Sequence, residues 1–199
     1  MNLFRTLRVG ALFLGTGLGL GGCLNPPEYP IEPSIEFGEV VKTHYPAAPG
    51  GIAIDSLEFK INFRDGDGDL GLSDVDLKSA PYTATTGGHN NRGYRYNYYI
   101  QTLTRNSAGR FVPLVFGFVG EFDGTYPRLD GAGTKAAPRT DGTNPKSAPI
   151  KGELRYKLPL LIENTKIRAG QVLRFEISIL DRGLHQSNVI TTPDVVVGP

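Results

Sequence analysis

Three aspartates at alternate positions, Asp65, Asp67 and Asp69, form the segment of the sequence with the clearest potential for chemistry. Gly66 and Gly68 separate them, and glycines allow the backbone to fold into a tight turn. Calcium prefers six to eight hard oxygen ligands at about 2.3–2.6 Å, and three carboxylates in one turn offer several of these. Without a cation the three carboxylates repel one another. The spacing therefore predicts a calcium-binding loop, and the alternative is a polar Asp/Gly turn that needs no metal.

The loop resembles the wider class of DxDxD calcium loops and differs from an EF-hand. Counted from Asp65, the EF-hand ligand positions fall on Asp65, Asp67, Asp69, Gly71 (through its carbonyl oxygen), Ser73 and Asp76. An EF-hand requires glycine at position 6, where this chain has Leu70, and glutamate at position 12, where it has Asp76. Flanking helices are also missing from the pattern. We therefore include Asp76 among the candidate ligands of a loop that lies between strands.

The segments that must position this loop follow a period of two residues, which is typical of strands with one buried face. Clear alternation covers residues 57–63, 153–158 and 173–179, and weaker strand patterns cover 35–42, 94–104, 111–119 and 189–197. The segment 106–109 has the composition of a hairpin turn. Seven strands without a convincing amphipathic helix predict an all-β fold, a single immunoglobulin-like β-sandwich over residues 34–199. Long loops are expected at 79–92 and 120–149.

The same alternation places a further acidic residue, Asp181, near the loop. The inward-facing series that begins at Leu57 continues to Asp65, and the series that begins at Leu173 continues to Asp181. In an immunoglobulin-like sandwich the loops after the second and sixth strands (B and F) lie at the same end. The segment 179–188 is similar to the Asp-…-Ser-Asn turn of bacterial Ig-like domains. The alternative is that Asp181 pairs with an arginine or caps its own turn.

The N-terminal segment has the features of a secretory signal. Arg5 and Arg8 precede an uncharged run over residues 9–22, which is too short to span a bilayer as a stable helix. The sequence Leu20-Gly21-Gly22-Cys23 resembles a bacterial lipobox, and Cys23 is the only cysteine of the chain. We expect a lipoprotein signal peptide at 1–22 and lipidation of Cys23. The alternative is an ordinary signal peptide with an unmodified cysteine.

The segment after Cys23 predicts how the domain is held at the membrane. Residues 23–33 include four prolines and are typical of a stiff, extended tether. The residues next to Cys23 include neither an aspartate, which would favour the inner membrane, nor an acidic run, which would favour surface export. We therefore expect a lipid anchor in the outer membrane, with the periplasmic face favoured over the cell surface.

The string DGDGDLGL at residues 65–72 resembles a segment of uncharacterised lipoproteins of the Bacteroidota. The lipobox and the C-terminal pair of strands extend this resemblance loosely over the chain from Cys23 onward. It implies an Ig-like domain in the cell envelope and carries no known activity.

Composition and motifs narrow the classes of function. The chain has 21 basic and 20 acidic residues, and this balance argues against nucleic acid as a partner. Nucleophile elbow, P-loop, HExxH and Cys/His motifs are missing from the sequence. We expect a non-catalytic binding or accessory module whose partners are the membrane, through Cys23, and a glycan or an envelope protein.

Two alternatives to this function stay open at this point. One is a glycan-binding component of a polysaccharide-uptake system that uses Tyr94, Tyr96 and Tyr98 on one strand face, although such a row is also typical of the edge of a core. The other is a hydrolase with its site in the 120–149 loop, where two acids would have to converge.

Overall fold

The computed structural model describes residues 28–116, 122–129, 148–163 and 165–199. The predicted signal peptide, Cys23 and most of the 120–149 loop, to which the hydrolase alternative belongs, lie outside these ranges. Within the described ranges no helix is long and apolar enough to cross a membrane.

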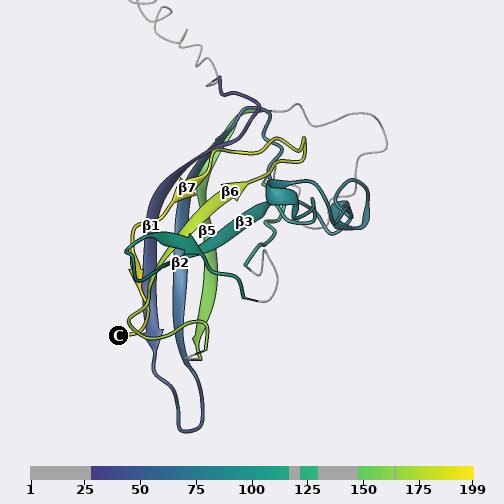
Figure 1. Ribbon diagram of the computed structural model, residues 1–199. Coiled ribbons are helices and arrows are strands. Elements are labelled where there is room, and N and C mark those ends of the chain that lie inside the picture. Colours follow the sequence, from purple (N-terminus) through teal and green to yellow (C-terminus); the bar gives the residue numbers. More distant parts are fainter. Residues whose placement is uncertain (1–27, 117–121, 130–147, 164) are drawn as a thin grey trace, which may run out of the picture.

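The protein is an all-β sandwich of two antiparallel sheets, as the alternating pattern predicts (Figure 1). The first sheet consists, in order, of β1 (Ser34–Tyr45), β2 (Ala53–Asp65) and β5 (Ile150–Ile162). The second consists of β4 (Phe111–Pro113), β3 (Tyr98–Arg105), β6 (Val172–Ile179) and β7 (Ile190–Thr191), with β8 (Val195–Val196) also paired to β6. Two short 3-10 turns complete the elements, at Asp76–Lys78 and His89–Asn91.

The last predicted strand, 189–197, is divided into β7 and β8. Pro193 lies between them and has no N–H to donate to a ladder. The hydroxyl of Thr192 accepts the Phe175 N–H at 3.0 Å, so a side chain replaces a backbone carbonyl at the break. The described structure therefore has eight strands where the pattern predicts seven.

The core lies between the two sheets and comes from the inward-facing residues of each strand. On β2 every second residue from Asp55 to Asp65 is buried. Phe59 of β2 meets Phe175 of β6 edge to face, with ring centroids 5.0 Å apart. Burial of one such side chain contributes about 1.5–3 kcal/mol, and this contribution fixes which face of each strand turns inward. Asp65 and Asp181 are the last buried residues of the inward-facing series of β2 and β6, and both lie at the end of the core.

The predicted tyrosine row is wrong, because β3 begins at Tyr98 and not at Tyr94. Gly93 has a φ of 85°, and the Tyr94 N–H donates to Ala84 O at 3.1 Å in a loop. The chain then bends at residues 94–95 and 97 before the strand begins. Tyr98 is fully buried, with its ring stacked 4.7 Å from that of Tyr156. Tyr94 and Tyr96 precede the strand, so the three tyrosines share no exposed strand face.

The two ends of the sandwich differ in what they carry. Ser34 pairs with Arg64, and Asp65 pairs with Ile150, so the start of β1, the acidic loop and the start of β5 share one end. The connection between β1 and β2 projects from the opposite end (Figure 1). The described chain therefore enters the sandwich beside the acidic loop.

Candidate metal-binding site

Four aspartates converge at the end of the sandwich where the chain enters. Asp65, Asp67, Asp69 and Asp181 each offer a carboxylate oxygen, and these four atoms lie within 4.8 Å of one another. Asp65 is the last residue of β2, and an isolated bridge joins Leu70 to Asp181 after β6. The predicted approach of Asp181 to the Asp65 loop is confirmed. The cluster thus contains one aspartate from the end of β2, one from the turn after β6 and two from the loop after β2.

Two oxygens of this cluster are buried without a hydrogen-bond partner. The Asp65 side chain is fully buried; its Oδ2 accepts the Asp69 N–H at 2.9 Å, and its Oδ1 has no partner. Asp67 Oδ1 is also buried and unpartnered. A buried acceptor left unsatisfied costs about 1–3 kcal/mol, and more when it is charged. These two atoms are the positions where a cation would replace a missing partner.

The other two aspartates are held by the turn after β6. Asp181 Oδ1 accepts the His185 N–H at 2.7 Å, and Oδ2 lies 2.9 Å from His185 Nδ1. Asp181 therefore caps its own turn, as the alternative interpretation held, and also joins the cluster. The Arg182 N–H lies 3.3 Å from Asp69 Oδ1. The sequence analysis did not identify His185 as a partner of Asp181. Its position four residues after Asp181, in a polar turn, is the signal that indicates this pairing.

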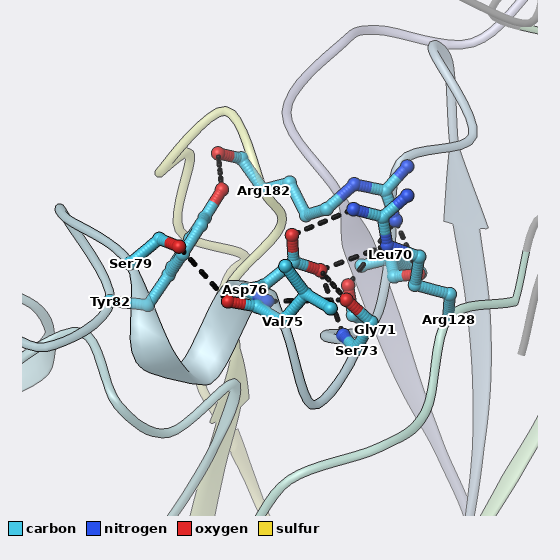
Figure 2. Close-up of polar contacts among 9 residues, drawn as sticks. All are labelled: Leu70, Gly71, Ser73, Val75, Asp76, Ser79, Tyr82, Arg128 and Arg182. Atoms are coloured by element: carbon cyan, nitrogen blue, oxygen red, sulfur yellow. Dashed lines mark hydrogen bonds and ion pairs between the residues drawn. The ribbon is translucent and has the colours of Figure 1, made fainter. Parts of the chain in front are cut away.

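The Arg182 side chain reaches across to the loop after β2. It donates to the carbonyl oxygens of Leu70 and Gly71, at 3.3 Å and 3.2 Å (Figure 2). The Gly71 carbonyl, which the EF-hand count assigns to a metal, is thus engaged by a guanidinium. The Arg182 carbonyl in turn accepts the Tyr82 hydroxyl at 2.8 Å. These bonds lock the loop after β2 onto the turn after β6.

The pKa values of the clustered aspartates are raised, because several carboxylates lie close together where little water reaches them. Burial, followed by the charges of Asp67 and Asp69, raises the pKa of Asp65 to about 7. Burial and the charges of Asp181 and Asp67 raise the pKa of Asp69 to about 6. Burial also raises the pKa of Asp181, against the hydrogen bonds from His185. A divalent cation at this position would reverse the repulsion and favour the ionised forms.

Asp76 lies outside the cluster and has a different role. Arg128 holds its carboxylate with two bonds, Nε to Oδ2 at 2.9 Å and Nη2 to Oδ1 at 2.7 Å (Figure 2). Ser73 donates to Asp76 Oδ2 through both its N–H and its hydroxyl, at 2.7 and 2.8 Å. Gly71, with a φ of 91°, turns the chain away from the cluster before these residues. The structure therefore brings together the first three EF-hand positions and not the later ones.

Arg128 was not predicted as a partner of Asp76. It lies in the 120–149 loop, which has no periodicity, so the sequence contains no signal for the pairing. The bidentate geometry and the buried Asp76 indicate a structural ion pair that holds the loop.

The chemistry available at the cluster is that of hard oxygen ligands. Four carboxylates suit calcium or magnesium and lack the soft thiolate ligands that select other metals. A cavity of about 660 Å³ lies elsewhere, at the β1–β2 connection, with His44 and Ile52 among its lining residues. The aspartates are therefore not part of that cavity. No family model, curated protein or solved structure matches this chain.

Proposed function

We propose that this protein is a lipid-anchored module of the bacterial cell envelope whose β-sandwich binds one calcium ion through Asp65, Asp67, Asp69 and Asp181. It acts without catalysis, as a binding or accessory module. The metal joins the loop after β2 to the turn after β6 and stabilises the end of the domain nearest the membrane.

One observation carries the metal proposal. Asp65 is fully buried, and its Oδ1 has no hydrogen-bond partner although it belongs to a group of four carboxylates within 4.8 Å. A polar turn that needs no metal would leave such an atom solvated or paired, because an orphaned buried acceptor is costly. A cation among the four carboxylates supplies the partner and offsets their repulsion.

Calcium fits this ligand set better than magnesium. Calcium accepts irregular coordination by six to eight oxygens, and backbone carbonyls and water complete a shell that four carboxylates begin. Magnesium demands a near-ideal octahedron and loses its water reluctantly. The ligands here come from a glycine-rich loop and a separate turn, which suits the larger and more tolerant ion.

The cellular setting of the proposal rests on the sequence. Leu20-Gly21-Gly22-Cys23 supports cleavage before Cys23 and lipidation of its thiol. The residues that follow support the outer membrane, on its periplasmic face. An envelope protein is the partner we propose, because the tyrosine row that favoured a glycan does not form an exposed strand face.

Calorimetric titration of residues 23–199, which contain both sheets and the whole core, tests the metal proposal. With Cys23→Ser to remove the thiol, we expect one calcium per chain with a Kd of about 10⁻⁴–10⁻³ M. Asp67→Ala removes the ligand oxygen together with its charge and should abolish binding. Asp74→Ala is the matched control, since Asp74 is an exposed acid in the same segment. Absence of binding to the unaltered chain, or equal binding to both variants, would refute the site.

A further inference from the structure

We propose that metal binding at the acidic loop controls how the tether is seated on the domain, so that calcium sets the orientation of the sandwich relative to its lipid anchor. This inference rests on the proposed function. It concerns residues 28–33, the described part of the tether, and their contact with Gly66.

The contact is a close approach of two backbones. A methyl group at Gly66 would collide with the carbonyl oxygens of Tyr29 and Pro30, so only glycine leaves room for the tether here. The spacing of the DGDGD string therefore has a steric reason in addition to its charge: the residue between Asp65 and Asp67 must have no side chain. The tether therefore lies against the residue that separates Asp65 and Asp67, two of the four candidate ligands.

The strand that the tether leads into, β1, is bonded to the other half of the site. At the start of β1, the Ile35 N–H donates to Asn188 Oδ1 at 2.8 Å, and Asn188 Nδ2 donates to Ile35 O at 2.9 Å. Asn188 belongs to the segment that follows the Asp181 turn. The tether thus contacts the loop after β2 at Gly66, and the strand that the tether leads into is held to the segment after the Asp181 turn by Asn188.

The coupling follows from these shared segments. With the site empty, repulsion among carboxylates with two unpartnered buried oxygens loosens residues 65–69 and the surface on which Tyr29 and Pro30 rest. With calcium bound, Asp65 and Asp67 are fixed and the backbone of Gly66 is fixed with them. Thermodynamic reciprocity then requires that whatever unseats the tether weakens calcium binding by the same factor by which calcium favours seating.

A nitroxide label on the tether measures how calcium changes the mobility of the tether. Ile31 is half exposed, so Ile31→Cys in residues 23–199 with Cys23→Ser carries a label without disturbing the core. We expect calcium to slow the label's rotation severalfold. The same label at Val112→Cys, in β4 of the other sheet, should not respond. Asp67→Ala, which removes the ligand oxygen, should remove the response at Ile31→Cys.

A second variant tests the reciprocal effect. Gly66→Ala should leave the label mobile with or without calcium and weaken calcium binding about fivefold or more. If calcium binds in calorimetry and the rotation of the Ile31→Cys label does not slow, the tether inference is wrong and the metal site stands. If calcium does not bind at all, the metal site and the tether inference are both wrong. The Ile31→Cys label in the protein with Gly66 unaltered still tests the tether inference even where Gly66→Ala does not fold.

Discussion

Asp65 and Asp181 come from different sheets, yet a carboxylate oxygen of each lies in a group spanning no more than 4.8 Å. Asp65 closes β2 in the first sheet, and Asp181 follows β6 in the second. Both are buried because each continues an inward-facing series. A cation held between them crosslinks the two sheets at one end, and this relationship makes the metal proposal a prediction about stability.

Calcium should therefore raise the melting temperature of residues 23–199. For a Kd of about 1 mM, ten-millimolar calcium stabilises the folded state by about 1.4 kcal/mol, which corresponds to about 3–6 °C for a domain of this size. Differential scanning calorimetry with calcium and with chelator measures the shift. Asp67→Ala, which removes the ligand oxygen, should show no shift and Asp74→Ala the full one, while magnesium should have little effect. A melting temperature that is the same in chelator and in ten-millimolar calcium would falsify the site.

Asp181→Asn tests whether the second sheet contributes a ligand. Removal of one of four carboxylates should lower calcium affinity roughly tenfold, because affinity follows the charge of the ligand set. Titration calorimetry measures this change. Asp194→Asn is the control, because Asp194 pairs with Arg174 near the start of β6, at the other end of that strand from Asp181. Equal affinity in Asp181→Asn and the unaltered chain would confine the site to the loop after β2.

The Asp76–Arg128 pair predicts a pH-dependent contribution to stability. Burial by itself raises the pKa of Asp76, but the hydrogen bonds from Arg128 and Ser73 outweigh it and hold the pKa below the usual 3.8. A carboxyl whose pKa is lowered by folding stabilises the protein above its unfolded pKa, and this stabilisation is lost as pH falls through the folded value. Asp76→Asn should lower the free energy of unfolding at pH 7 by about 3 kcal/mol, since it removes the charge that the Arg128 guanidinium binds.

Urea unfolding at two pH values checks this. The difference between Asp76→Asn and the unaltered protein should shrink as the pH falls below the usual carboxyl pKa of 3.8 and through the lower pKa of folded Asp76, because Asp76 then loses its charge as well. Asp74→Asn should change little at either pH, since Asp74 is exposed. A difference that stays constant across the two pH values would show that the charge of Asp76 does not contribute.

The anchor is tested by replacing the single cysteine. Full-length protein should fractionate with outer membranes, and Cys23→Ser should release it or leave it unprocessed, because the proposed lipidation requires the thiol as acceptor. Immunoblotting of membrane and soluble fractions, with the apparent mass of the chain, measures both effects. Protection from protease in intact cells is expected for the periplasmic face, and rapid digestion would place the domain outside. Identical processing and fractionation of the two proteins would contradict lipidation.

Much of the fold and the centre of the candidate site could be predicted from local pattern. Alternation over 57–63 and 173–179 specifies which strand faces are buried. A strand has a strict period of two, and the face that carries the apolar residues turns toward the core. Continued by one step, the same rule places Asp65 and Asp181 inward at the end of the core. The acidic string itself identifies Asp67 and Asp69.

The remaining features depend on contacts that no local pattern encodes. In the sequence Asp76 falls at ligand position 12 of the EF-hand count. In the structure Gly71 turns the chain away, and Arg128, from a loop without periodicity, binds the Asp76 carboxylate. Tyr94 and Tyr96 share the parity of Tyr98, but bends of the chain at residues 94–95 and 97 keep them out of β3. The sequence by itself determined the two-residue period of the strands, the face of each strand that is buried and the charge of the acidic loop, because each is a property of neighbouring residues. Only the tertiary structure decided the partners of Asp76 and the approach of the tether to Gly66, because these depend on where distant loops lie once the two sheets have packed.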